Sequence, residues 1–308
     1  MHITVLGSAA GGGYPKWNCN HPNSARARSG DPKAPQRTQS SLAVSADGER
    51  WALFNASPDL RQQINANAIL QPRVELRESP IKAVVLTNAD VDHVAGLLNL
   101  RESQPLRLYG TERVLSVLAA NTIFNVLNPQ FVSRDPIKLE TAFELTTQEG
   151  DGLGLSVTPF AVPGKVALWL EDKGKGDNFG TVEEDTIALE VADQSGARFY
   201  YMPACAKMTK ALAKRVAGAD LIFFDGTLWV DDEMIRDGVG VKTGQRMGHM
   251  SVSGAQGTIE AFRDLNVARK IFIHINTTNP ILIEDTPERK SVEAEGWEVS
   301  YDGMAIEI

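Results

Sequence analysis

The chain has 308 residues, with 39 acidic against 31 basic side chains and a formal net charge of −8 at pH 7. This acidic balance makes nucleic acid and anionic membranes poor partners. No stretch approaches the ~18 uninterrupted apolar residues of a membrane span, and the N-terminus lacks the regions of a signal peptide. Two cysteines, Cys19 and Cys205, are too few for a disulfide framework. We therefore expect a cytoplasmic, reduced protein with no membrane span.

The first predicted strand, residues 2–7, runs into a glycine-rich turn. Its glycines allow positive φ and a close approach of the backbone to a neighbouring group. Neither the Gly-Lys-Ser/Thr of a P-loop nor the G-x-G-x-x-G spacing is present. We interpret the turn as structural or substrate-facing, with Gly11 and Gly12 as candidate substrate contacts.

Cys19 and His21 follow with the spacing of metal ligands, and Ser24 lies where a third ligand could be. Two good ligands fall short of the four in a structural zinc site, so this pair is only a weak candidate for a structural metal. Residues 25–40 are basic and predict a surface loop. Its Arg26 and Arg37 are either solvated charges or a rim for a carboxylate-bearing substrate.

The remaining elements alternate between strands and helices, with hairpins across Asp47-Gly48 and residues 194–196. Helices are expected near residues 59–67, 111–120, 209–217, 252–263 and 287–294. Further strands are expected near residues 41–45, 50–54, 81–86, 106–110, 143–147, 153–161, 186–192, 197–202, 220–225, 270–274, 297–300 and 304–308. Segments 121–136, 171–185 and 231–248 are interpreted as loops. No linker is evident, so residues 1–308 are interpreted as one α/β domain with mixed sheets layered with helices.

Residues 81–97 carry the clearest chemical signal. An apolar strand is followed within seven residues by an acidic, histidine-bearing turn and then by an apolar helical pattern. A solvated turn whose aspartates cap a helix is the ordinary interpretation. The alternative is a metal site at the edge of a sheet, with Asp90, Asp92 and His93 as ligands.

The positions of the histidines favour the metal site. The sequence has five histidines, and His93, His249 and His274 follow apolar strands or open helices. Asp225 also ends a buried strand. Side chains at strand ends of α/β proteins commonly gather into one site. A lone histidine is more often structural, but three in such positions indicate a metal site.

The segment T-N-A-D-V-D-H-x-x-G at 87–96 resembles the T-H-x-H-x-D-H-x-x-G motif of the metallo-β-lactamase superfamily. Further motifs resemble the PqqB family, which acts in the biosynthesis of pyrroloquinoline quinone (PQQ): GSAAGGGYPKWNC, RTQSS, NASPDLR, DGTLW, MGH, IHIN and the closing DGM. The resemblance implies an α/β fold, a four-layer αβ/βα sandwich with two mixed sheets.

The sequence also departs from the superfamily motifs. Asn88 and Asp90 stand where hydrolytic members carry two histidines, and Cys205 follows a strand where a bridging aspartate is expected. A two-zinc hydrolase site is therefore largely dismantled. The PqqB motif Cys-x-Cys-x-x-Cys reads Cys19-x-His21-x-x-Ser24, which puts the structural zinc in doubt.

The ligand set that remains is Asp90, Asp92, His93 and His274. Carboxylates and imidazoles without a thiolate suit a mononuclear iron(II) site better than zinc, although zinc is an alternative there or at the Cys19 and His21 pair. His249 is a candidate for proton transfer, against the alternative that it only caps a helix. Asp225 is assigned as a catalytic residue that either orients a ligand histidine or bridges to the site. Asn88 and Ser251 are assigned as substrate contacts.

The resemblance implies iron- and oxygen-dependent hydroxylation of the tyrosine ring in a cross-linked Glu–Tyr intermediate of PQQ biosynthesis. The partner would then be a small peptide-derived precursor or PQQ itself. Two alternatives stay open from the sequence: a carrier or transport factor for PQQ without chemistry, and a degenerate metal-dependent hydrolase. A homodimer is also left open.

Overall fold

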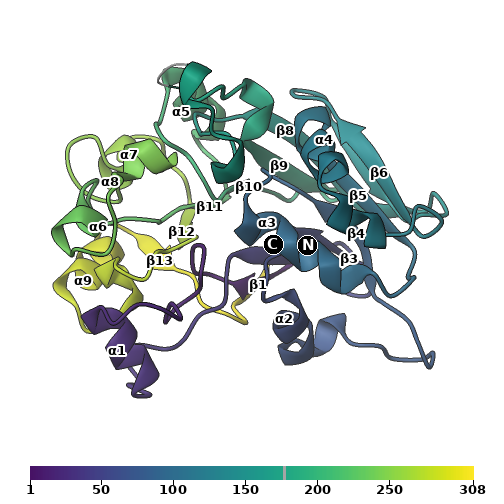
Figure 1. Cartoon of the computed structure of the whole chain (residues 1–308), viewed down its shortest axis with the longest axis horizontal. Helices are drawn as coiled ribbons and strands as arrows, with labels where there is room; N and C mark the ends of the chain where they lie inside the picture. Colours follow the sequence, from purple (N-terminus) through teal and green to yellow (C-terminus); the bar gives the residue numbers. More distant parts are fainter. Residues whose placement is uncertain (176–177) are drawn as a thin grey trace.

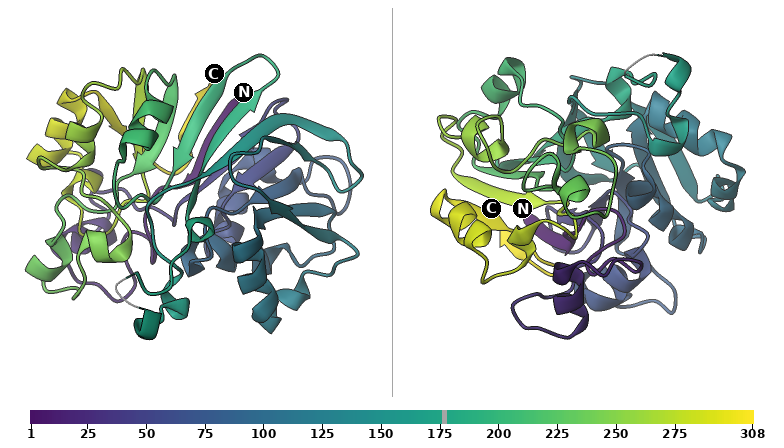
Figure 2. Two further views of the ribbon diagram at one scale, coloured as in Figure 1. Left: turned by 90° about the horizontal axis from the view of Figure 1, so that it is seen from above. Right: turned by 60° about the vertical axis from the view of Figure 1, so that its left-hand side comes forward.

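The structure, a computed structural model, describes residues 1–175 and 178–308. Two seven-stranded mixed sheets face each other, and helices cover their outer sides (Figures 1 and 2). One apolar layer lies between the sheets, and a second and a third separate each sheet from its helices. The predicted α/β four-layer sandwich with two mixed sheets is confirmed.

Each sheet combines strands from distant parts of the chain. In spatial order, the first sheet contains β14 (Ala305–Glu307), β1 (His2–Gly7), β2 (Ser41–Ser45), β3 (Trp51–Phe54), β4 (Ile81–Val85), β5 (Leu106–Thr111) and β6 (Val132–Ile137). The second sheet, again from one edge to the other, contains β13 (Trp297–Val299), β12 (Arg269–Ile273), β11 (Leu221–Asp225), β10 (Arg198–Met202), β9 (Ile187–Asp193), β8 (Gly152–Ala161) and β7 (Phe143–Thr146).

The helices are short. The α-helices are α1 (Pro22–Arg28), α2 (Leu60–Ala66), α3 (Val91–Val94), α4 (Glu112–Ala120), α5 (Lys210–Val216), α6 (Glu233–Arg236), α7 (Gly244–Met247), α8 (Thr258–Ala261) and α9 (Pro287–Ala294). The 3-10 helices are η1 (Ala68–Leu70), η2 (Ala95–Leu100), η3 (Thr122–Val126), η4 (Leu168–Leu170), η5 (Lys173–Lys175), η6 (Glu183–Asp185) and η7 (Pro280–Leu282). Within the described ranges, no helix is long and apolar enough to span a membrane.

Parallel strands position the site. β4 pairs in parallel with β3 and β5, and β11 pairs in parallel with β10 and β12. Every residue of β11 is buried, as are four of the five residues of β4, because apolar side chains cover both faces. The polar residues that follow β4, β11 and β12 therefore emerge at strand ends held firmly by packing.

Several segments differ from the sequence-based expectation. The predicted loop 231–248 contains two short helices, α6 and α7. The predicted loop 121–136 contains most of β6, an edge strand whose polar sequence hides its pairing with β5. The basic segment 25–40 begins inside α1, whose N-cap is His21. The helix predicted at 252–263 is limited to α8, because Gly254 takes a φ of 90° and Gly257 caps the helix. Residues 176 and 177 of the predicted loop 171–185 lie outside the described residues.

Gly96 gives a test of how tightly the turn after β4 is packed. A Cβ at this position would lie 2.0 Å from the Ser57 carbonyl oxygen, which is backbone and cannot rotate away. We expect Gly96→Ala to lower the free energy of unfolding by about 3 kcal/mol in urea titrations. Gly152→Ala is the matched control, because no atom lies within 4 Å of its added methyl group. Equal stability of the two variants would contradict this close packing.

Candidate metal centre

A cavity of about 420 Å³ opens where β4, β11 and β12 end. Asp92 and His93 reach it from α3, which follows β4, and His274 reaches it directly after β12. One oxygen or nitrogen atom of each of these three side chains lies within 4.8 Å of the others. The structure therefore brings together three of the four predicted metal ligands, from sequence positions about 180 residues apart.

His93 offers an unsatisfied nitrogen to this cluster. Its Nδ1 lies 2.8 Å from the Asn88 side-chain oxygen, which also accepts a hydrogen bond from the Asp90 backbone N–H. Nδ1 must therefore carry the proton, which leaves Nε2 as an acceptor. Nε2 is buried and has no hydrogen-bond partner in the described part of the chain. An orphaned buried acceptor is costly, and a bound cation would satisfy it.

His274 is oriented in the same way by Thr227. The Thr227 hydroxyl donates to Asp225 at 2.6 Å, so its oxygen accepts from His274 Nδ1 at 2.9 Å. His274 Nε2 then faces the Asp92 carboxylate at 3.0 Å. Two acceptors at this distance need a proton or a metal ion between them. The His274 backbone has a φ of 59°, a strained conformation for a residue with a side chain.

The protonation states of Asp92, His93 and His274 are compatible with a cation bound between these side chains. Burial lowers the pKa of His93 to about 4, so the ring is neutral at pH 7 and able to act as a ligand. Burial alone would raise the pKa of Asp92, but the His93 and His274 rings lower it. Burial would likewise lower the pKa of His274, yet the hydrogen bond and charge of Asp92 raise it. The proton shared by Asp92 and His274 thus lies where a metal ion could replace it.

Asp225 and His249 form a second group beside the first. The Asp225 carboxylate accepts from the Cys205 and Thr227 backbone N–H groups, the Thr227 hydroxyl and His249 Nδ1. These four bonds use the lone pairs of the carboxylate, so Asp225 orients its neighbours in this structure. One ligand atom each of Asp225, His249 and His274 also lies within 4.8 Å of the others, so these side chains form a second group that could hold a cation. His249 Nδ1 lies 2.7 Å from Asp225, and its Nε2 has no hydrogen-bond partner among the residues that the structure describes. The ring stacks on His274 at 5.1 Å between centroids.

Asp90 lines the same cavity but is engaged elsewhere. One of its oxygens lies 3.4 Å from Lys165 Nζ, and the other accepts from the Leu168 backbone N–H at 3.1 Å. It is outside the group of ligand atoms formed by Asp92, His93 and His274. In this structure Asp90 therefore ties the segment after β8 to the cavity.

Cys19 and His21 are not part of this cluster. His21 Nδ1 accepts from the Asn23 backbone N–H, and Nε2 lies 3.1 Å from Asp237. Among residues 1–175 and 178–308, no third His, Cys, Asp or Glu ligand joins Cys19 and His21 in a compact group. Ser24 instead shares a hydrogen bond with Thr277 at 2.7 Å.

The predicted substrate contacts are dispersed. Gly11 lines the cavity, and a Cβ there would lie 3.2 Å from an Asp92 oxygen. Arg26 forms ion pairs with Asp31 and Asp285 outside the cavity.

Three further predicted contacts do not line the cavity. Arg37 is buried and donates to the Ser300 carbonyl oxygen at 2.8 Å. Ser251 borders a different hollow, and Gly12 lies beside Lys16. Of the proposed contacts, Gly11 and Asn88 therefore line the site itself.

Sequence reasoning missed several residues of the cavity. Thr227, Asn276 and the lysines Lys16, Lys165 and Lys242 all line it. A hydroxyl two residues after the strand-end aspartate was a usable signal for Thr227. The lysines had no such signal, because a charged residue in a loop is usually solvated.

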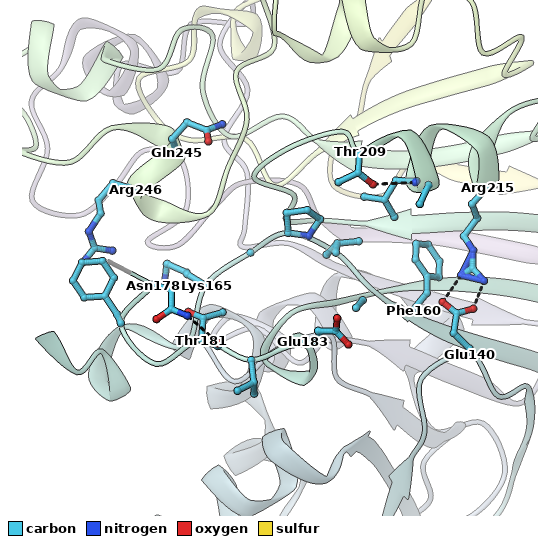
Figure 3. Close-up of a pocket in the computed structure, with 18 residues that line it drawn as sticks. Glu140, Phe160, Lys165, Asn178, Thr181, Glu183, Thr209, Arg215, Gln245 and Arg246 are labelled. Atoms are coloured by element: carbon cyan, nitrogen blue, oxygen red, sulfur yellow. Dashed lines mark hydrogen bonds and ion pairs between the residues drawn. The ribbon is translucent and has the colours of Figure 1, made fainter. Parts of the chain in front are cut away.

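A second cavity of about 600 Å³ adjoins the first and shares Gly164 and Lys165 with it. Arg215 and Glu140 form an ion pair at one end, and Arg246 lies at the other end (Figure 3). Arg246 is itself paired with Glu171 and stacked over Phe179. The charged ends of this second cavity are thus already neutralised.

The fold and the site define the class of protein. A family described as "Beta-lactamase superfamily domain" matches residues 50–275, and the chain belongs to it. A diphosphatase of the PhnP family shares the fold, with a TM-score of 0.69 and 19% identity over 100% of this chain and 96% of that one. The fold implies a bound metal, and Asp92, His93 and His274 provide the ligands that could hold it.

Within this superfamily the chain belongs to the PqqB family. It is 56% identical, over 100% of both chains, to "Coenzyme PQQ synthesis protein B" from Xanthomonas oryzae pv. oryzae (strain MAFF 311018). The crystal structure of Zn²⁺-bound PqqB from Methylobacterium extorquens matches with a TM-score of 0.94 and 51% identity over 100% of both chains. The chain therefore has the fold of a zinc-bound relative over its full described length.

The assigned tautomers of His93 and His274 predict graded losses of metal affinity. His93→Ala removes a ligand atom and should abolish stoichiometric binding of Zn²⁺ or Fe²⁺ in calorimetric titrations. Thr227→Val should weaken binding about 10- to 100-fold, because His274 loses its orienting partner, and Thr227→Ser should restore it. His21→Ala is the matched histidine control and should leave this affinity unchanged. Equal affinities for Thr227→Val and the wild type would contradict the assigned tautomer.

Glu233 predicts a pH dependence of stability. Burial raises its pKa from 4.5 to about 7, although Thr278 and the Trp229 backbone N–H donate to it. The protonated form is favoured in the folded protein, so its stabilisation is present below pH 4.5 and is lost as the pH rises through 7. Relative to Glu233→Gln, the wild type should lose up to about 3 kcal/mol of unfolding free energy between pH 4.5 and 8. The same difference in unfolding free energy between the wild type and Glu233→Gln at both pH values, measured by urea titration, would contradict this.

Proposed function

We propose that the protein catalyses an iron- and oxygen-dependent hydroxylation of a tyrosine-derived ring in PQQ biosynthesis. The single observation that carries this proposal is the ligand set of Asp92, His93 and His274. Two imidazoles and one carboxylate, without a thiolate, are the ligands typical of non-haem iron(II) oxygenases. The names of the PQQ synthesis relatives support the pathway.

Asp92, His93 and His274 would hold the ion, with Asn88 and Thr227 fixing the two imidazole tautomers. When bound, iron(II) supplies the redox chemistry that activation of dioxygen requires and that zinc lacks. The chain itself would position the ring against the cavity wall. Apolar side chains in the cavity wall include Leu168, Met234, Val241 and Met247.

His249 would exchange protons with the substrate. Asp225 holds its Nδ1, so the free Nε2 can accept the phenolic proton of a tyrosine ring and return it. In the overall step an aromatic C–H bond becomes C–OH with one atom of dioxygen. The second oxygen atom leaves as water, and two electrons and two protons come from an external reductant of the ascorbate class.

Labelled dioxygen tests the proposal. Protein loaded anaerobically with iron(II) is mixed with ascorbate, a cross-linked Glu–Tyr compound and ¹⁸O₂, and the product is analysed by mass spectrometry. We expect one labelled oxygen atom per hydroxylation, no label with zinc-loaded protein or His93→Ala, and normal labelling with His21→Ala. Labelling that survives in His93→Ala would refute the assignment of the site. Tight binding of the product without any turnover would favour a carrier.

A further inference from the structure

The cavity around the candidate metal centre concentrates positive charge in an acidic protein. Lys16, Lys165 and Lys242 line it, against the carboxylates of Asp90 and Asp92. The chain as a whole has a net charge of −8, so this local excess of cations is not a general property of the surface. A recess with fixed cations attracts and orients anions.

Two of the three lysines have acidic partners. Lys165 Nζ lies 3.4 Å from Asp90, and its side chain is largely buried. Lys242 Nζ lies 3.5 Å from a Glu171 oxygen, but Arg246 holds the same carboxylate more closely, at 2.6 Å. Lys242 is therefore the weaker partner of Glu171 and can turn toward a ligand at low cost.

Lys16 has neither an ion pair nor a side-chain hydrogen bond within residues 1–175 and 178–308. Its aliphatic part lies across Gly12, where an added Cβ would be 2.7 Å from Lys16 Cε and 3.0 Å from Cγ. The Gly12 backbone N–H is in turn fixed by the Gln39 side chain at 2.8 Å. The glycine turn thus supports the stem of Lys16 beside the cavity, and the Lys16 ammonium group has no partner among the described residues.

We propose that Lys16, assisted by Lys242, binds a carboxylate of the substrate and so selects polycarboxylates over their neutral analogues. This inference rests on the proposed function, because it concerns the substrate of the same site. Lys165 forms an ion pair with Asp90, so its role is structural. Lys16 is thus a specificity-determining residue that does not touch the reacting atoms.

The chain offers a matched set of variants. Lys16→Met keeps the aliphatic stem that covers Gly12 and removes only the charge, whereas Lys16→Arg keeps the charge. Lys290→Met makes the same exchange at an exposed position of α9, outside the cavity. Any loss seen with Lys16→Met but not with Lys290→Met therefore reports the charge at the cavity.

The probes are PQQ, which has three carboxylates, and its neutral trimethyl ester, titrated calorimetrically into the full-length, metal-free protein. We expect Lys16→Met to weaken PQQ binding about tenfold, as loss of a charged hydrogen bond implies, and to change ester binding less than twofold. Lys16→Arg should recover most of the affinity. The dependence of PQQ affinity on salt should also be shallower in Lys16→Met than in the wild type.

Three results would overturn the inference: unchanged PQQ affinity in Lys16→Met, equal losses for PQQ and ester, or no PQQ binding by the wild type. The outcome is separate from that of the oxygen-labelling test. A protein that binds PQQ through Lys16 but incorporates no oxygen would retain this inference and refute the hydroxylation. In the labelling assay, Lys16→Met should raise KM about tenfold with kcat within twofold.

Discussion

The contact between the Asp92 carboxylate and the His274 ring is the interaction on which the site depends, because the two residues come from different sheets. Asp92 follows β4 of the first sheet, and His274 follows β12 of the second. Both strands are held by buried apolar side chains on the shared core. A metal ion between these two groups would therefore join the two halves of the sandwich, and anything that shifts one sheet would change the ligand geometry.

The neighbouring hydrogen bonds hold this contact ready for a metal. His274 has a strained backbone, and its carbonyl oxygen and Nδ1 both face the Thr227 hydroxyl. Thr227 is in turn held by Asp225, a fully buried carboxylate with four donors. Within the described part of the chain, the buried side-chain atom of this polar cluster that lacks a hydrogen-bond partner is the candidate ligand atom His93 Nε2, which is the pattern expected of a preorganised site.

How much could be predicted depended on where the partners of each residue lie. The strands before the site were predictable because their apolar runs are strong local signals, and the acids and histidines that follow them were found for the same reason. Glu233 was not found, because its partner Thr278 is 45 residues away in sequence. Thr227 was not found although it lies two residues after the strand-end Asp225, because its contact with His274 spans 47 residues and only the fold shows it. α1 was missed because Asn23 bonds the Thr277 and Thr278 carbonyl oxygens, 254 and 255 residues along the chain, and its sequence shows only basic charge.

The residues that replace the superfamily ligands have acquired other roles, and these roles favour a single ion. Asn88 sets the tautomer of His93, and Asp90 pairs with Lys165. Burial raises the pKa of the Cys205 thiol to about 12, so it is protonated at pH 7 and a poor ligand, while its backbone N–H holds Asp225. A second ion would have to displace these contacts. Asp92, His93 and His274 would then offer a single cation two imidazoles and one carboxylate, with His249 beside them.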